Sequence, residues 1–171
     1  MSRNYYSEIN LHLVWHTKES EPLLVPDVEE FTHQWIRRRI VASSDVFIHE
    51  VGGTENHVHL CVSIFPTVTI SDFIGQVKGA CSHDVNEQFR HRGKVLQWQS
   101  GYGVVSFGSG DLEWVCGYVR AQKARHAAGT VDDRLERITE LESEAEAASA
   151  RSPVNGAQLA RSDNRKLEDR A

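Results

Sequence analysis

The sequence of 171 residues lacks the marks of several large classes of protein. It has no apolar run near the ~20 residues that a membrane-spanning helix needs, so we expect no membrane association. Its first residues are polar and acidic, unlike a secretory signal peptide. The three cysteines form no close pair and no Cys-x-x-Cys motif, which argues against a disulfide framework and a structural zinc site. We therefore expect a cytoplasmic protein with reduced thiols.

Basic charge is also scarce, and one end of the chain has no aromatic residue. The 19 Lys and Arg against 24 Asp and Glu give a net charge of −5, whereas a nucleic-acid binder usually has a basic excess. All aromatic residues and histidines lie before residue 129. The change in composition predicts a domain over residues 1–128, an acidic helical extension over 129–150, in which Leu135, Ile138 and Leu141 recur at helical spacing, and a disordered tail over 151–171.

The first 128 residues contain a regular series of secondary-structure patterns. Alternating apolar residues predict strands over 9–15, 46–51, 57–64 and 101–107. Apolar residues at helical spacing predict helices that begin at Pro26, at residue 70 and at Leu112. This order predicts an α+β fold, the ferredoxin-like split βαββαβ sandwich with helices on one side of an antiparallel sheet, followed by a C-terminal helix that bears a tyrosine. Such a fold hosts many functions and assigns none by itself.

Two histidines stand together in the third predicted strand. Because side chains alternate along a strand, His57 and His59 project to the same face about 7 Å apart, while Val58 takes the opposite face. Two neutral imidazoles side by side can chelate a divalent ion. The alternative is a pair of half-exposed histidines on a wet sheet face.

The last predicted helix carries a second constellation, Tyr118 and Gln122. At positions i and i+4 they lie one above the other, at the boundary of the apolar face of the helix. There the tyrosine can place its hydroxyl beside the sheet, and the amide can supply an oxygen ligand. The alternative is a tyrosine that packs its ring and leaves its hydroxyl in water.

Together these motifs resemble the HUH single-strand transposases, which include the IS-two-hundred-like insertion-sequence enzymes and the REP-associated tyrosine transposases. The resemblance covers roughly residues 5–128. It rests on segments that occur in the family's order: residues 12–18, 56–60 (Asn-His-Val-His-Leu), 74–79, 98–103 with Ser106, and 118–122 with His126.

The resemblance implies metal-dependent cleavage and rejoining of single-stranded DNA at hairpin-flanked ends, through a 5′-phosphotyrosine intermediate on Tyr118. A phenol with a pKa near ~10 is a weak nucleophile at neutral pH, and the phosphodiester repels attack. A Mg²⁺ or Mn²⁺ ion held by His57, His59 and Gln122 would draw charge off the phosphate and orient it. No residue stands out as a general base.

DNA contacts are predicted where positive charge clusters and where an aromatic ring can stack on an unpaired base. These residues are Lys78, Arg90, Arg92, Lys94, Tyr102 and Lys123. Each charged cluster has the alternative reading of a solvated face. The implied partner is single-stranded DNA with hairpin structure, which places the protein at the nucleoid when bound. The resemblance implies a homodimer for many members and a monomer for others, so the sequence leaves this open.

The chain departs from the family pattern at several positions. Glu19 and Ser20 stand where an aromatic residue and an arginine are common, Ala121 replaces a frequent asparagine, and Ala127 replaces a second histidine. These departures fit a domesticated relative that processes repeats as well as a mobile transposase. Two other interpretations stay open: a metal-dependent nuclease in which water attacks, and a nonenzymatic domain of the same fold that binds nucleic acid or protein.

Overall fold

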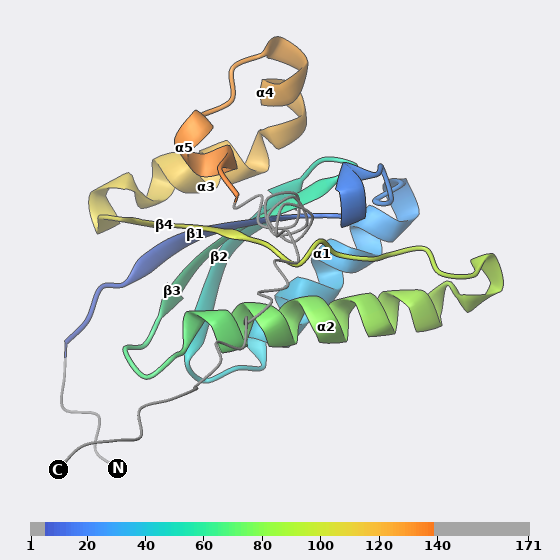
Figure 1. The fold of residues 1–171 in the computed structure, drawn as a ribbon. Coiled ribbons are helices and arrows are strands. Elements are labelled where there is room, and N and C mark those ends of the chain that lie inside the picture. The colour runs from blue at the N-terminus through green and yellow to red at the C-terminus, as the bar shows by residue number, and fades with distance from the viewer. Residues whose placement is uncertain (1–5, 139–171) are drawn as a thin grey trace, which may run out of the picture. The chain divides into compact units, whose positions relative to one another are not determined.

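A single antiparallel sheet is the centre of the protein, whose computed structural model describes residues 6–138 (Figure 1). The described residues belong to the first of two compact units, Met1–Glu140. The strands are β1 (Asn10–His16), β2 (Val46–Gly53), β3 (His57–Ile64) and β4 (Gly103–Phe107). They lie in the order β2-β3-β1-β4, and every neighbouring pair is antiparallel. This is the predicted ferredoxin-like arrangement, and the fold prediction is confirmed.

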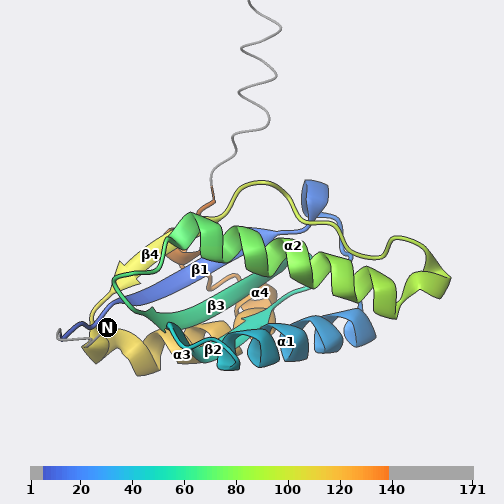
Figure 2. The same cartoon turned by 90° about the horizontal axis from the view of Figure 1, so that it is seen from below.

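Helices cover both faces of the sheet. α1 (Pro26–Val41) and α2 (Ile70–Gln88) lie on one face, as Figure 2 shows from below. α3 (Leu112–Arg120), α4 (Gln122–Ala128) and α5 (Asp133–Glu136) lie on the other face, above the sheet in Figure 1. Short 3-10 turns occupy Lys18–Ser20, Arg90–Arg92 and Ser109–Asp111. No described helix is long and apolar enough to cross a membrane.

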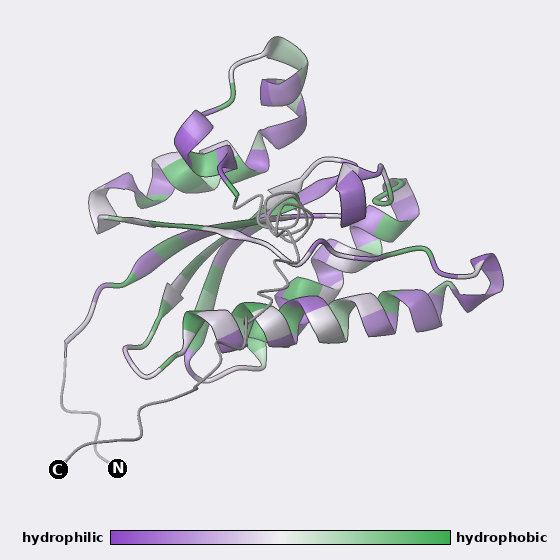
Figure 3. Cartoon of the chain, viewed as in Figure 1, coloured by the Kyte–Doolittle hydropathy of each residue, from purple (hydrophilic) through white to green (hydrophobic). Residues whose placement is uncertain are grey.

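The central strands divide their side chains between these two layers. Val58, Leu60 and Val62 of β3 enter the large apolar core with α1 and α2. The alternate residues face the other layer, where Cys61 packs against α3 in a second, smaller apolar cluster. Figure 3 shows the same contrast between the helices, since α3 has apolar residues along its middle and α4 is mostly hydrophilic. His57 and His59 therefore lie between the sheet and the helices that follow β4.

The backbone of α3 comes very close to β2 at one glycine. A Cβ atom on Gly52 would overlap the carbonyl oxygen of Val119. Val119 is fully buried and immediately follows Tyr118. The missing side chain at Gly52 therefore sets how deeply the tyrosine-bearing helix sits on the sheet.

The prediction of one continuous helix through Tyr118 and Gln122 is wrong. α3 ends at Arg120 and α4 begins at Gln122, because Ala121 leaves helical geometry (φ −95°, ψ 13°). The amide of Ala121 donates to two carbonyls, of Gly117 at 3.1 Å and of Tyr118 at 3.2 Å, which tightens the last turn. The break turns Gln122 toward the sheet, where it is 1% exposed.

The acidic extension is helical for one turn within the described residues. α5 begins after Asp132, whose carboxylate caps it by accepting from the amides of Arg134 and Leu135, and Arg137 already has extended geometry. Leu135 is buried against the domain, so it is not free to contact a second subunit. Leu141 and the tail over 151–171 lie outside the described residues, and the domain boundary at residue 128 stays a prediction.

We expect Gly52→Ala to lower the free energy of unfolding by about 1–3 kcal/mol, because the new methyl group must push α3 off β2. Urea denaturation measures the change. Gly79→Ala in α2 is the control: a Cβ there meets nothing within 4 Å, and alanine should be neutral or stabilise the helix by about 0.5–1 kcal/mol. Equal stability of Gly52→Ala and the wild type would contradict the close contact.

Candidate active site

Imidazoles gather between the sheet and α4. The Nε2 atom of His12 on β1 lies 2.8 Å from Nδ1 of His59 on β3. The ring of His57 is 4.8 Å from that of His59 and 4.8 Å from that of His126 on α4. His12, His57 and His59 are almost fully buried. The predicted pair thus belongs to a larger cluster. The alternative interpretation, half-exposed histidines on a wet face, is wrong because α3 to α5 cover this face.

Neighbouring polar groups orient the ring of His57. Its Nδ1 atom lies 2.7 Å from Oδ1 of Asn56 and 3.0 Å from the Thr54 hydroxyl. Since the asparagine oxygen can only accept and is the nearer of the two oxygens that face the ring, Nδ1 of the neutral ring carries the hydrogen, and the Nε2 lone pair faces a second acceptor, the Gln122 oxygen, as two ligands of one cation would. That Nε2 atom points to the cluster centre, 3.2 Å from Oε1 of Gln122. This arrangement is typical of a histidine that ligates a metal.

Tyr118 is fully buried against the same cluster. Its ring lies 6.0 Å from that of His59, between the stacked indole of Trp114 at 5.9 Å and the Arg125 guanidinium at 4.8 Å. The hydroxyl accepts from the Asp132 amide at 3.0 Å and donates to Glu136. The structure therefore brings together Tyr118, Gln122 and the His pair, but the hydroxyl is not in water as the alternative interpretation of this tyrosine has it.

Glu136 is the residue that the sequence analysis missed. Its Oε2 atom lies 3.2 Å from Nε2 of His59, 3.6 Å from that of His126 and 3.7 Å from that of His57. Its Oε1 atom accepts from the Tyr118 hydroxyl and, at 3.3 Å, from the Gln122 amide. In the sequence it is one of many acids in a Glu-rich extension, and only its place beside the apolar Leu135 marks it.

Burial sets the charge of these groups. It lowers the pKa of His12 and of His57 to about 3, and the neighbouring imidazole of His59 adds to this effect. Burial, with the hydrogen bond to Glu136, raises the pKa of Tyr118 to about 12. Burial opposes ionisation of Glu136, but its contacts with His59 and Tyr118 hold the pKa well below its usual range. At neutral pH His12, His57 and His59 are thus neutral, Glu136 is a carboxylate and Tyr118 keeps its proton.

The side chains at this centre fit a divalent cation. Ligand atoms of His57, His126 and Glu136 lie within 4.8 Å of one another. Nε2 of His59 is buried and lies 3.2 Å from Oε2 of the same carboxylate. Metal bonds of ~2.1 Å put neighbouring ligands about 3 Å apart, close to the spacings around Glu136. Neutral imidazoles with carboxylate and amide oxygens form a mixed donor set that suits such an ion.

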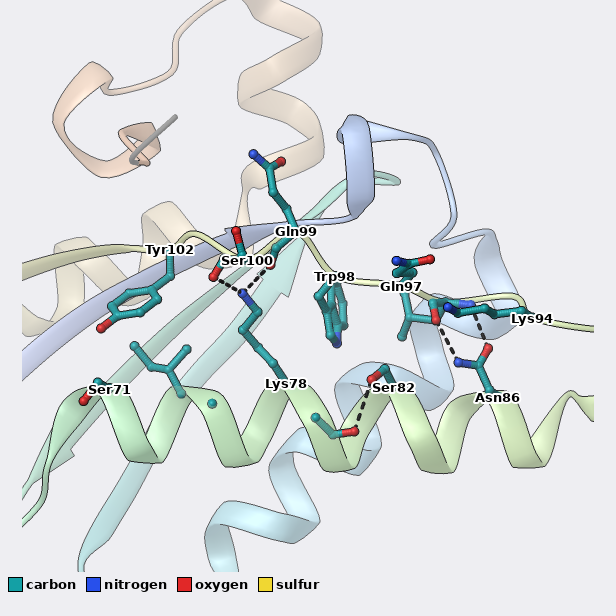
Figure 4. A pocket seen from close by; sticks show the side chains of 14 residues that line it. Ser71, Lys78, Ser82, Asn86, Lys94, Gln97, Trp98, Gln99, Ser100 and Tyr102 are labelled. Carbon is teal, nitrogen blue, oxygen red and sulfur yellow. Dashed lines mark hydrogen bonds between the residues drawn. The ribbon is translucent and has the colours of Figure 1, made fainter. Parts of the chain in front are cut away.

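Lys78 does not face solvent, so the prediction that Lys78 contacts DNA is wrong. It is 8% exposed, and its ammonium group fixes the segment before β4 (Figure 4). Its acceptors are the carbonyl oxygens of Gln99 at 2.6 Å, Ser100 at 3.1 Å and Gly101 at 3.0 Å.

The other predicted DNA contacts are spread over the surface. Arg90 pairs with Glu87 at 3.0 Å, and Arg92 pairs with Asp27 at 2.5 Å. Lys123, which pairs with Glu29, is the one of the six that lines the cavity of about 700 Å³ in front of His57 and His126. Lys94 and Tyr102 line a different hollow, beside α2. The structure does not unite these residues into one basic surface.

Comparison with known proteins decides the family. The family described as "Transposase IS200 like" matches residues 5–122. The chain belongs to this family. The resemblance is confirmed, and membership of the IS200-like family makes the chain a transposase-type, DNA-cleaving enzyme.

Individual relatives of the IS200-like chain are distant. The ISDra2 transposase TnpA of Deinococcus radiodurans is 24% identical over 124 residues, which cover 70% of this chain and 88% of the relative. A crystal structure described as a candidate transposase, from Deinococcus radiodurans R1, has a TM-score of 0.56 at 23% identity and covers 71% of this chain and 96% of its own. It shares the fold. A REP-associated tyrosine transposase bound to a REP hairpin has a TM-score of 0.47 at 14% identity, with 77% and 75% of the two chains covered.

We expect the metal-free protein to lose stability as the pH falls from about 6.5 toward 3. The unfolded imidazoles of His12 and His57 bind protons near pH 6.5, whereas the folded ones resist protonation down to about pH 3. Each such group lowers the free energy of unfolding by about 1.4 kcal/mol per pH unit in this range. Glu136, whose folded pKa is also depressed, adds a loss of the same sign.

Denaturant titrations in a chelator, repeated at several pH values, measure this slope. His12→Gln should flatten it, and His83→Gln, which changes a side chain that is 79% exposed, should leave it unchanged. A slope that is equal in all three proteins would contradict the buried neutral cluster.

Proposed function

We propose that this IS200-like protein cleaves and rejoins single-stranded DNA through a covalent 5′-phosphotyrosine on Tyr118, with the help of a divalent metal ion. One observation carries the proposal. The hydroxyl of Tyr118 and the Nε2 atoms of His57 and His59 all converge on one carboxylate, that of Glu136. A nucleophile and a cation-binding cluster thus share one buried centre.

The reaction exchanges one phosphodiester for another. The Tyr118 oxygen attacks the phosphorus, its bond to phosphorus forms, and the bond from phosphorus to the 3′-oxygen breaks. The phenolic proton is lost, and the leaving strand takes up a proton to end in a 3′-hydroxyl. In the rejoining step a 3′-hydroxyl attacks the phosphotyrosine and releases the tyrosine. Because the energy of the phosphodiester is retained, no further energy source is needed for joining.

The ligands of the ion would be His57, His59 and Gln122, as the resemblance implies, with Oε2 of Glu136 within reach as a further oxygen. The bound ion withdraws charge from the scissile phosphate and orients it. Burial supports this role, because it keeps the imidazole nitrogens neutral and available as ligands. The Nε2 atom of His12 contacts Nδ1 of His59 and so orients the His59 ring, which makes His12 a positioning residue.

The chain also prepares the nucleophile. The Asp132 amide donates to the phenolic oxygen at 3.0 Å, which favours the ionised form of Tyr118. Oε1 of Glu136 covers the same hydroxyl. The phosphate can reach Tyr118 only when this partly buried carboxylate swings off the hydroxyl.

The substrate we infer is single-stranded DNA that carries a hairpin, as the resemblance implies. Support for a single strand comes from the shape of the site, since His57 and Glu136 line a cavity bordered by His16, His126 and Lys123, and the buried hydroxyl of Tyr118 contacts Glu136. A flexible strand can enter such a hollow, whereas the rigid duplex would have to be opened first. Homodimer formation and association with the nucleoid stay predictions.

We expect Tyr118→Phe to abolish the covalent protein–DNA adduct and strand joining, while the fold and DNA binding are retained. The free energy of unfolding should fall by about 1–3 kcal/mol, because Glu136 and the Asp132 amide lose their hydroxyl partner. The measurement is a denaturing gel after incubation with labelled hairpin DNA and Mn²⁺. Tyr6→Phe, which removes a hydroxyl from a side chain of an exposed residue, is the control and should form the adduct normally.

The gel also separates the rival interpretations. A nuclease that uses water would release product without an adduct in Tyr118→Phe and in Tyr6→Phe alike. A nonenzymatic binding domain would give neither product nor adduct. An adduct that persists in Tyr118→Phe would refute the nucleophile.

We expect the double variant His57→Ala, His59→Ala to lose Mn²⁺ binding by at least about 100-fold, because two imidazole ligands disappear. Isothermal titration calorimetry measures the affinity directly, without reference to activity, and circular dichroism verifies the fold. His49→Ala with His83→Ala removes two histidines outside the cluster and serves as the matched control. Undiminished Mn²⁺ affinity in the first variant would contradict the metal site.

A further inference from the structure

A second hollow lies on the other side of the sheet, between α2 and the segment that leads into β4. Figure 4 shows its lining side chains, with α2 along one wall and residues 94–102 along the other. Its volume is about 490 Å³, within the range of ~300–1,000 Å³ of small-molecule sites. We call it the α2 groove.

Apart from Ile74 and Lys78, the α2 wall of the groove has only small or short polar side chains. Small and polar side chains follow one stripe of the helix at spacings of three and four residues: Ser71, Gly75, Gly79, Ser82 and Asn86. A Cβ atom on Gly75 or on Gly79 would meet nothing within 4 Å. Neither close packing nor backbone geometry explains these glycines, although each costs helix stability. Their effect is to leave room in the groove.

Aromatic rings form the opposite wall. Trp98 and Tyr102 are both half-buried, and the Trp98 indole packs edge-on against the core residue Trp15 at 6.0 Å. Figure 4 shows the Trp98 ring extending toward α2. Its Nε1 atom has no hydrogen-bond partner among the described residues and is shielded from solvent. Lys94 and Gln97 add polar groups along this wall.

The groove wall is joined directly to the active site. The backbone amide of Gln99 donates to the His16 carbonyl at 3.0 Å, and the backbone amide of Lys18 donates to the Gln97 carbonyl at 2.9 Å. The His16 ring stacks on His57 at 5.1 Å. Lys78 holds the same segment from below. One short stretch of backbone therefore has the groove on one side and the wall of the cavity on the other.

We propose that the α2 groove binds one unpaired nucleobase of the single-stranded DNA, at a distance from the scissile phosphate; this rests on the proposed function. Because Lys78 crosses the groove to the carbonyls of residues 99–101, between the two aromatic rings (Figure 4), a planar base can pack between the Gly79 part of the helix wall and the ring of Trp98. The base stacks on the exposed part of the Trp98 ring, and Lys94, which lines the groove, can pair with a phosphate. The base would fix the register of the strand relative to Tyr118.

The test fills the groove without disturbing the fold. Gly79→Leu places a side chain in the open space, and because no atom lies within 4 Å of the new Cβ, the melting temperature should not fall. Gln76→Leu, an exposed position of the same helix outside the groove, is the matched control. The probes are fluorescent hairpin DNAs with unpaired flanks, each with one abasic nucleotide at a different unpaired position, and binding is measured by anisotropy in a chelator.

We expect the wild type to lose affinity by roughly 5- to 100-fold when one particular base is missing, the effect of losing one stacked base. Gly79→Leu should bind all probes alike, with the affinity of the wild type for that abasic probe, and Gln76→Leu should behave as the wild type.

Either of two results would overturn the groove proposal: unchanged affinity in Gly79→Leu, or a loss that is equal for intact and abasic probes. The first means that the groove stays empty, and the second means that it contacts only the backbone. Both are distinct from failure of the proposed function, which would show as an absent Tyr118 adduct in the wild type. If the wild type forms the adduct and Gly79→Leu binds DNA as the wild type does, the proposed chemistry is supported and the groove proposal is refuted.

Discussion

The antiparallel pairing of β1 with β3 is the constraint on which the site depends. Its register sets His16 opposite His57 and Val14 opposite His59, so histidines of both strands share one face while Trp15 and Val58 enter the core on the other. A shift by one residue would exchange the two faces and bury imidazoles in the apolar core. Because the core with α1 and α2 is large, it resists that shift, and the position of the histidine cluster follows from it.

The second layer gives this face its chemistry. α3 packs on β2 through Gly52 and on β3 through Cys61, which brings Tyr118 to the imidazoles. The layer also excludes water, and burial then keeps the imidazoles neutral and the phenol protonated. Buried polar groups need partners. Glu136 supplies them to the histidines and the hydroxyl at once, which explains why a residue from an acidic extension belongs to the centre of the site.

Much of the fold and of the candidate site could be predicted from the sequence. The alternation of residues 57–64 gives β3 with the bounds that the structure has, and the helical period after residue 70 gives α2. The proximity of Tyr118 to His59 and of Gln122 to His57, an expectation from the resemblance, also appears in the structure. Two interpretations failed for a common reason. A break at Ala121 and the burial of Lys78 depend on distant partners, the sheet and the carbonyls of residues 99–101, and local patterns contain no information on them.

The sequence by itself determined the order of strands and helices and the face on which each histidine lies, because both follow from periodicities along the chain. Family membership added which residues to regard as nucleophile and ligands. Only the tertiary structure decided that Glu136 joins them, that His12 supports His59, and that glycines of α2 border a hollow opposite Trp98. These relations join residues far apart in sequence, and they arise when whole layers pack on one another. The type of one residue does not indicate which distant residue it will contact in that packing.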